Sequence, residues 1–265
     1  MDLGLSGKSA LVTGSYRGTG AGIARVLVRE GVRVFIHGLE AGQADAVVAE
    51  LRAAGGDVEP VTGDVRDDAG AEAVAEAVLA AGGPDILVNN FGRAEGRGWL
   101  DGTSDDWNDM WQTNVLSAAR MVRLLVPSMK QRGAGRVLFL STVGSARPRA
   151  QMPGYYASKA SLANMTVSLA KELAGTGITV NTISPGIIAT AEVRASLERR
   201  AAKEGWGDDW ESIQRAAASD FMPNPSGRIG DVEDVGALVA FLASDRAAYI
   251  NGADYRIDGG AADCV

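Results

Sequence analysis

The sequence predicts one α/β domain with a doubly wound, mostly parallel sheet of seven strands. Short apolar runs alternate with longer segments of helical periodicity, as expected when parallel strands are joined by crossover helices. No Pro-rich or Ser-rich linker interrupts this alternation, so residues 1–265 are expected to form a single domain. The 34 glycines suit a fold with many tight turns between strands and helices.

The individual elements follow from the same alternation. Strands are expected at residues 10–13, 33–37, 58–62, 86–89, 136–141, 179–183 and 254–257. These runs are short and mostly rich in Val, Ile and Leu, as strands buried on both faces should be. Helices are expected at residues 20–30, 43–53, 69–80, 104–131, 155–173 and 232–243. Helices in these positions would cover both faces of a parallel sheet.

Residues 190–226 break the alternation, because three helical fragments follow one strand without a new strand between them. A long excursion from the carboxyl edge of a parallel sheet commonly covers a ligand site. We therefore predict that residues 190–226 form a substrate lid. The alternative is a surface insertion that only adds packing.

Composition and charge narrow the class of protein. The formal charge is −7 and no block of Lys and Arg is present, so neither nucleic acid nor an anionic membrane surface is an expected partner. No long apolar stretch or signal-peptide pattern is seen, which predicts a cytoplasmic protein with no membrane span. Cys264 is the one cysteine and is expected to be a surface thiol. The one histidine, His37, gives no reason to expect a metal site.

The segment TGSYRGTG, residues 13–20, stands between the first expected strand and the first expected helix. Glycines let the backbone turn tightly and approach a diphosphate, and the following helix offers free N–H groups at its N-terminus. A tight turn alone needs one glycine, whereas this segment has three. Its position therefore favours a dinucleotide-binding turn.

The end of the second strand bears on the choice of dinucleotide. Folds that prefer NAD commonly place an acid there to accept hydrogen bonds from the ribose hydroxyls. That position is Gly38 here, and Glu40 lies two residues later. Arg17 in the glycine turn could meet a 2′-phosphate instead, although a solvated loop charge is the alternative. These residues favour NADP(H) over NAD(H).

Tyr155 and Lys159 stand four residues apart at the start of an expected helix and so share one face. A neighbouring ammonium favours the phenolate, which brings the phenol pKa of about 10 closer to neutral pH for proton exchange with an alcohol or carbonyl. Ser141 ends the fifth strand at the same edge of the sheet as the glycine turn, where its hydroxyl could bind the substrate oxygen. Tyr156 is an alternative to Tyr155, and Thr142 is an alternative to Ser141.

With these motifs the chain resembles the short-chain dehydrogenase/reductase family, a Rossmann-type family with a YxxxK motif. The resemblance runs from TGSYRGTG to the end of the chain. It also includes Asp64-Val65, NNFG at residues 89–92, Asn114-Val115, PGIIAT at residues 185–190, NGA at residues 251–253 and DGG at residues 258–260. Each motif is weak alone, but their order and spacing are specific.

The resemblance implies a role for each matched residue. Tyr155 would exchange the proton, Lys159 would lower its pKa, and Ser141 would orient the substrate oxygen. Asn114, at a helix distortion, would hold a water that links Lys159 to solvent. The cofactor-binding residues implied are Gly14, Ser15, Arg17, Gly18, Thr19, Gly20, Asp64, Val65, Asn90, Gly92, Tyr155, Lys159, Pro185, Gly186, Ile188 and Thr190.

The chain also departs from the family pattern. Phe91 replaces the usual alanine, and Thr19 replaces a residue that is usually apolar. The spacing from Ser141 to Tyr155 is one residue longer than the family suggests, which leaves Ser141 and Thr142 both open as the substrate-orienting residue. A bulky ring at position 91 could narrow the cofactor site or shift its preference.

The resemblance implies an NAD(P)(H)-dependent oxidoreductase that interconverts a small-molecule carbonyl and a secondary alcohol by hydride transfer. A 3-oxoacyl-thioester reductase of the same family is the close alternative. A dinucleotide-binding sensor or scaffold without turnover is the alternative from another class. The lid contains aromatic side chains that favour an apolar substrate and acidic side chains that would repel an acidic carrier. The resemblance further implies a homo-oligomer, a tetramer or dimer, formed through residues 104–131 and 155–173.

Overall fold

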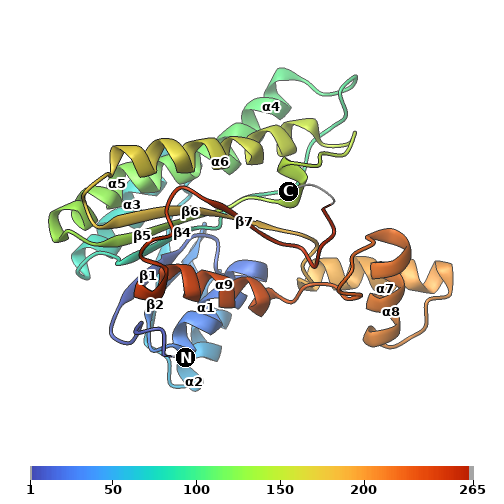
Figure 1. Cartoon of the computed structure of the whole chain (residues 1–265), viewed down its shortest axis with the longest axis horizontal. Helices are drawn as coiled ribbons and strands as arrows, with labels where there is room; N and C mark the ends of the chain where they lie inside the picture. Colours follow the sequence, from blue (N-terminus) through green and yellow to red (C-terminus); the bar gives the residue numbers. More distant parts are fainter. Residues whose placement is uncertain (1, 263–265) are drawn as a thin grey trace.

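The computed structural model describes residues 2–262, so Cys264 lies outside the described residues. Seven strands form one sheet in the order β3-β2-β1-β4-β5-β6-β7, and every recorded pairing is parallel. The predicted fold class is therefore confirmed (Figure 1). The strands are β1 (Ser9–Val12), β2 (Arg33–Gly38), β3 (Val58–Thr62), β4 (Ile86–Asn89), β5 (Gly135–Leu140), β6 (Ile178–Pro185) and β7 (Asp254–Ile257).

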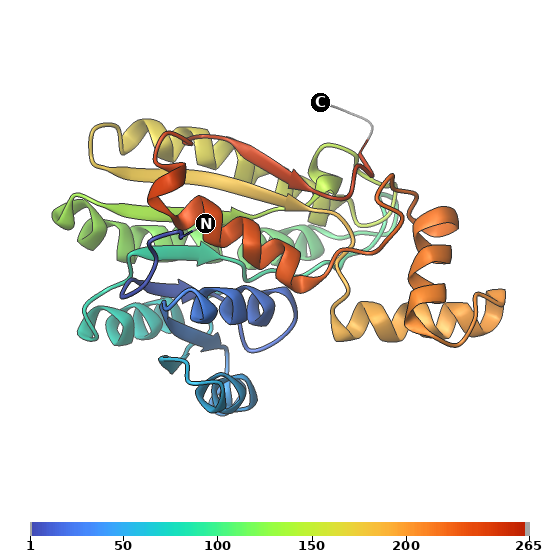
Figure 2. The same ribbon diagram turned by 60° about the horizontal axis from the view of Figure 1, so that its bottom comes forward.

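Helices cover both faces of this sheet (Figures 1 and 2). One hydrophobic cluster joins the sheet to α1 (Gly18–Arg29), α2 (Asp45–Ala53) and α9 (Val232–Ala243). A second cluster joins the opposite face to α3 (Asp68–Ala80), α5 (Ser117–Arg132) and α6 (Pro153–Glu172). In β1, Ala10 and Val12 belong to the first cluster and Leu11 to the second, because successive strand residues point to opposite faces.

The predicted helix over residues 104–131 is observed as a helical run with a distortion in it. It consists of α4 (Ser104–Trp111), a π-helical turn over Gln112–Leu116, and α5. A π turn accommodates an extra residue without a break in the helix, so the apolar periodicity of the sequence gave no sign of it. The distortion lies where the family resemblance placed it, around Asn114.

Helix α6 begins at Pro153, two residues before its predicted start. Proline fits the first turn of a helix because the N–H that it lacks would have no intrahelical partner there. Tyr155 consequently lies in the first turn of α6, facing the carboxyl edge of the sheet.

Residues 190–226 contain three helical pieces, as predicted. These are α7 (Ala191–Glu204), α8 (Trp210–Ala216) and a π-helical turn (Ala217–Phe221). The segment has its own small hydrophobic cluster, which includes Leu197 and Ile213. Figure 2 shows the two helices projecting beside the carboxyl edge of the sheet. Across residues 2–262, no helix has both the length and the apolar character needed to cross a membrane.

Candidate active site

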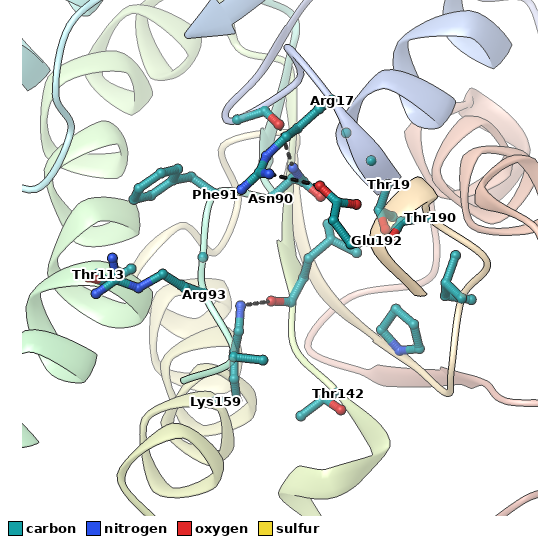
Figure 3. A pocket seen from close by; sticks show the side chains of 18 of the residues that line it. Arg17, Thr19, Asn90, Phe91, Arg93, Thr113, Thr142, Lys159, Thr190 and Glu192 are labelled. Atoms are coloured by element: carbon teal, nitrogen blue, oxygen red, sulfur yellow. Dashed lines mark hydrogen bonds and ion pairs between the residues drawn. The ribbon is translucent and has the colours of Figure 1, made fainter. Parts of the chain in front are cut away.

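A cavity of about 730 Å³ opens at the carboxyl edge of the sheet (Figure 3). Its walls come from the glycine turn after β1, from the segments that follow β2 to β6, and from the starts of α6 and α7. The sequence-predicted residues in these walls are Gly14, Arg17, Gly18, Thr19, Gly20, Asn90, Gly92, Ser141, Tyr155, Lys159, Pro185, Gly186, Ile188 and Thr190. The structure thus brings together most of the predicted set from segments far apart in sequence.

The glycine turn has the form that close approach of a ligand requires. Gly14 and Gly18 have φ angles of +65° and +56°, which favour glycine over residues with a side chain. A Cβ atom on Gly20 would lie 2.6 Å from Asn90 Nδ2, so a side chain here would displace the loop after β4. Helix α1 begins directly after Arg17 and no side chain caps it, which leaves its first N–H groups free for an anion.

Three predicted cofactor residues lie behind the cavity wall instead of in it. Ser15 is fully buried, and its hydroxyl donates to the Val12 carbonyl at 2.7 Å. Val65 is also fully buried and belongs to the core. Asp64 forms an ion pair with Arg66 at 2.6 Å, and it is Arg66 that reaches the cavity. The guanidinium and its hydrogen bonds hold the pKa of Asp64 below its usual range.

An ion pair connects the glycine turn to residues 190–226. Arg17 Nη1 lies 2.7 Å from Glu192 Oε1, in the first turn of α7, and both side chains are more than half exposed (Figure 3). Thr190 caps the same helix by accepting from the Val193 N–H at 3.3 Å. The start of α7 is thereby fixed near the α1 N-terminus.

Tyr155 lines the cavity, whereas the ring of Tyr156 packs against Gly144. A Cβ atom on Gly144 would come within 2.2 Å of Tyr156 Cε1. The Tyr156 ring therefore occupies space that is free only because residue 144 has no side chain. The structure therefore places Tyr155, and not Tyr156, at the position from which a substrate could be reached.

The two hydroxyls after β5 have different surroundings. Ser141 is buried, and its Oγ donates to the Lys159 carbonyl at 2.9 Å. Thr142 is half-buried in the cavity wall next to Tyr155, and its Oγ1 accepts a hydrogen bond from the Gly144 N–H at 3.2 Å. Ser141 thus touches the cavity, but its hydroxyl is directed into the protein, and Thr142 carries the hydroxyl beside the phenol.

Lys159 and Tyr155 share the cavity, but the pKa of the Tyr155 phenol differs from the sequence prediction. Lys159 Nζ donates to the Leu140 carbonyl at 2.7 Å, and burial lowers its pKa from 10.5 to about 8. Burial raises the pKa of Tyr155, and the neighbouring Thr142 hydroxyl only partly offsets this rise. The expected lowering of the phenol pKa is not seen, because desolvation of the buried phenol is the largest influence on it and raises its pKa.

Asn114 lies behind this pair in the π-helical turn. It is buried, its Oδ1 accepts from the Arg93 N–H at 2.9 Å, and its Nδ2 donates to Ser158 Oγ at 3.1 Å. A Cβ atom on Gly92 would lie 2.7 Å from Asn114 Oδ1 and 2.8 Å from Lys159 Nζ. Asn114 Oδ1 and Lys159 Nζ therefore both lie close to Gly92, in space that any side chain at position 92 would need.

Several cavity residues had no assigned role in the sequence motifs. They are Tyr16, Leu39, Arg66, Phe91, Arg93, Ala94, Glu95, Thr113, Leu140, Ile187, Glu192 and Val193; Thr142, the predicted alternative to Ser141, also lines the cavity. Phe91 had been noted as a departure: its ring lies against Gly14, with Cδ2 3.3 Å from where a Cβ would stand. The remaining side chains could not be found by motif, because loops that are distant in sequence bring them to the cavity.

The walls fit a dinucleotide. The uncapped start of α1, the left-handed glycines and the close packing at Gly20 form a cradle that side chains would fill. The doubly wound sheet, this cradle and the tyrosine and lysine in one cavity define the class: a dinucleotide-dependent oxidoreductase.

Comparison with known proteins gives the family. Residues 14–262 match the family model described as Enoyl-(Acyl carrier protein) reductase. The chain is 35% identical over 261 residues to D-beta-hydroxybutyrate dehydrogenase of Cupriavidus necator, covering 97% of this chain and 98% of that protein. It is 35% identical over 259 residues to 3-oxoacyl-(acyl-carrier-protein) reductase of Salmonella typhimurium, with the same coverage.

The structure of L-sorbose reductase from Gluconobacter frateurii, complexed with NADPH and L-sorbose, superposes with a TM-score of 0.92 at 31% identity, and all of both chains is covered. The chain belongs to the short-chain dehydrogenase/reductase family. It is an oxidoreductase of the type that interconverts carbonyl and alcohol groups with a nicotinamide dinucleotide.

Proposed function

We propose that the cavity catalyses reversible reduction of a small-molecule ketone to a secondary alcohol with NADP(H), and that Tyr155 exchanges the proton. The observation that carries this proposal is the convergence of Tyr155, Thr142 and Lys159 on the cavity that the glycine turn also lines. A bound nicotinamide would supply or accept the hydride there.

Tyr155 is suited to give a proton in the direction of reduction. The phenol is protonated at neutral pH, since its ordinary pKa of 10 is raised further by burial, and it can donate to a carbonyl oxygen as negative charge develops there. Thr142 would orient that oxygen, because its hydroxyl adjoins the phenol while the Ser141 hydroxyl is engaged by the Lys159 carbonyl. This assigns to Thr142 the role that the sequence motif suggested for Ser141.

Lys159 would hold the nicotinamide ribose, and Asn114 would hold a water that passes protons from Lys159 to solvent. The position of both Asn114 Oδ1 and Lys159 Nζ beside Gly92 supports this arrangement. Gly14, Arg17, Gly18, Thr19 and Gly20 would hold the diphosphate and ribose. Asn90, Gly92, Pro185, Gly186, Ile188 and Thr190 would make the other predicted cofactor contacts from the cavity wall, whereas Asp64, Val65 and Ser15 would support that wall from behind.

NADP(H) is favoured over NAD(H) by charge at the adenosine end. Arg17 and Arg66 line the cavity, and β2 ends in Gly38 without a carboxylate there. Gln43 packs against Gly38, since a Cβ on the glycine would lie 2.9 Å from Gln43 Cβ. The neighbouring L-sorbose reductase structure contains NADPH, which agrees with this preference.

The substrate that we favour is a small or medium-sized ketone or alcohol of low charge. Residues 190–226 would act as its lid, since Thr190, Glu192 and Val193 line the cavity. Slower amide hydrogen exchange in α7 and α8 on ligand binding would be the sign of such a lid.

A 3-oxoacyl-thioester reductase is the second candidate, favoured by the relative from Salmonella typhimurium. The exposed acids Asp208, Asp209 and Glu211 oppose an acidic carrier.

We further propose a cytoplasmic homo-oligomer, either a dimer or a tetramer. A groove of about 720 Å³ lies between α5 and α6, lined by apolar side chains that include Val122, Val126, Met165 and Leu169. A second copy of the chain could cover this groove. Light scattering coupled to gel filtration measures the mass, and a monomeric mass at micromolar concentration would contradict this part of the proposal.

Replacement of Tyr155 by phenylalanine tests the proposed chemistry. Tyr155→Phe should lower kcat by about a thousandfold, since it removes the proton donor, while NADPH binding measured by calorimetry persists. Tyr156→Phe is the matched control and should keep its activity, because its ring packs on Gly144. NADPH oxidation followed at the nicotinamide absorbance with a panel of ketones is the assay. An active Tyr155→Phe enzyme would overturn the assignment.

A further inference from the structure

His37 is the one histidine of the chain and lies at the end of β2, with no exposed surface. Its Nδ1 accepts a hydrogen bond from the Gly14 N–H at 2.8 Å. Its Nε2 lies 2.9 Å from the carbonyl oxygen of Gly63, just after β3. One ring therefore connects the first glycine of the glycine turn to the residue that follows β3.

These two partners determine the protonation state of the ring. A backbone N–H can only donate and a carbonyl can only accept, so Nδ1 must carry the lone pair and Nε2 the proton. A proton added to Nδ1 would point at the Gly14 N–H and abolish that hydrogen bond. The neutral ring with the proton on Nε2 is the form that satisfies both neighbours.

The main chain of His37 adds two further contacts to the same turn. Its N–H donates to Ser15 Oγ at 2.9 Å, and its carbonyl accepts from the Tyr16 N–H at 3.2 Å. Three consecutive turn residues, Gly14, Ser15 and Tyr16, are thus held by one histidine. The edge of the Phe91 ring packs against the imidazole, with ring centroids 6.4 Å apart, and helps to exclude water.

We propose that His37 is a positioning residue that fixes the glycine turn for the dinucleotide diphosphate, and that protonation of its ring releases the turn and weakens cofactor binding. The inference rests on the proposed dinucleotide-binding function. Gly14 adopts a left-handed backbone with φ of +65°, so the orientation of its peptide is sensitive to the one side chain that binds its N–H. His37 touches the turn from behind and acts on the cofactor through it.

The charged groups around the ring come from neighbouring segments. Asp64 and Arg66, after β3, form an ion pair with each other. Tyr16 lies in the turn, and the segment after β4 contributes the non-ionisable Phe91. Desolvation lowers the pKa of His37 from its usual value of 6.5, more than the Gly63 carbonyl and the Asp64 carboxylate raise it. The ring is therefore neutral at pH 7 and takes up its proton only in acid.

Variants at position 37 distinguish a specific role in positioning the glycine turn from a general loss of protein stability. In His37→Asn, the side-chain oxygen stands two bonds beyond Cβ, as Nδ1 does, and can still accept from the Gly14 N–H. His37→Leu removes the acceptor. We expect His37→Leu to weaken NADPH binding by about tenfold, the effect of one lost hydrogen bond, with little change in kcat at saturating NADPH. His37→Asn should bind NADPH nearly as well as the wild type.

Asn181 provides the matched control. It is also fully buried, donates to the Ile250 carbonyl at 2.9 Å and accepts from the Ala253 N–H at 3.1 Å, away from the cavity. Asn181→Leu should lower thermal stability to a similar extent and leave the NADPH affinity intact. If His37→Leu binds NADPH as tightly as Asn181→Leu does, the positioning role is wrong.

Measurements across pH complete the test. Wild-type affinity for NADPH should fall only at a pH below the ordinary histidine pKa of 6.5, because burial lowers the pKa of His37. His37→Asn should not show this loss of affinity in acid. Nitrogen NMR of the wild-type chain should show one imidazole with an unprotonated Nδ1 at pH 7. A protonated Nδ1 would overturn the inference without any variant. A wild-type chain that binds neither NADPH nor NADH would instead overturn the proposed function itself.

Discussion

The two hydroxyl residues that follow β5 show how much depends on one position in the sequence. Ser141 and Thr142 are consecutive, and consecutive residues in extended backbone point to opposite sides. Ser141 Oγ donates to the Lys159 carbonyl, whereas Thr142 stands beside the Tyr155 phenol. The longer spacing from Ser141 to Tyr155 was the sequence feature that left Thr142 as a candidate for orienting the substrate oxygen. The directions of the two hydroxyls favour Thr142 for this role.

Substitution of these two residues should give opposite results. Thr142→Val should lower kcat by about a hundredfold, since loss of a hydrogen-bond donor to the developing oxyanion has effects of this size. Thr142→Ser should restore most of the turnover because it restores the hydroxyl. Steady-state kinetics with one ketone and NADPH measures both.

Ser141→Ala serves as the control for that series. It removes a buried hydrogen bond to the Lys159 carbonyl and should lower the free energy of unfolding by about 1 kcal/mol while turnover persists. Urea unfolding and kinetics on the same preparation test this. A fully active Thr142→Val enzyme together with an inactive Ser141→Ala enzyme would return the assignment to Ser141.

At the scale of elements, the junction of β2 and α2 controls the adenosine end of the cavity. Strand β2 ends at Gly38, and Gln43 Oε1 accepts from the Leu39 N–H at 2.9 Å. Gln43 therefore closes the turn in which dinucleotide folds that prefer NAD usually carry an acid. This packing was invisible in the sequence, because it depends on how the turn brings position 43 back to position 38.

An acid at Gly38 should change the cofactor preference. Gly38→Asp is expected to shift the ratio of the NADPH and NADH dissociation constants toward NADH by about tenfold, because the carboxylate repels a 2′-phosphate and accepts from ribose hydroxyls. Gly38→Ala introduces the same Cβ against Gln43 without the charge and should weaken both cofactors equally. Calorimetric titration gives the ratio, and an unchanged ratio in Gly38→Asp would refute the charge argument.

At the scale of the whole molecule, the active site places a cost on folding. Lys159 is almost fully buried, and burial lowers its pKa from 10.5 to about 8. Below pH 8 the amine is charged in both the folded and the unfolded chain, so the folded state bears the desolvation penalty. Above pH 10.5 it is neutral in both, and the penalty is absent. The destabilising contribution of Lys159 is thus full below about pH 8 and disappears as the pH rises to 10.5.

Removal of this ammonium should therefore stabilise the protein while it abolishes turnover. Lys159→Met should raise the free energy of unfolding near pH 7 by up to about 3 kcal/mol, since each pKa unit corresponds to about 1.4 kcal/mol. The difference from the wild type should shrink as the pH rises from 8 to 10.5. Urea unfolding at several pH values measures it, and a variant that is less stable at every pH would contradict the prediction.

Much of the fold could be predicted because its signals are local. The short apolar strands, the helical periodicities and the glycines of the turn each depend on a few neighbouring residues. The start of α6 at Pro153 was missed by two residues, since periodicity fixes helix ends poorly. The π turn around Asn114 left no trace in the periodicity and was expected only through the family resemblance.

The sequence by itself determined the alternation of strands and helices, the position of the glycine turn and the pairing of Tyr155 with Lys159 on one helix. Only the tertiary structure decided that Thr142 adjoins the phenol, that the Leu140 carbonyl holds Lys159, and that His37 binds the Gly14 N–H. The physical reason is that periodicity records which side of an element a residue occupies. A hydrogen-bond partner depends on the register between elements, where a shift of one residue reverses the direction of a side chain.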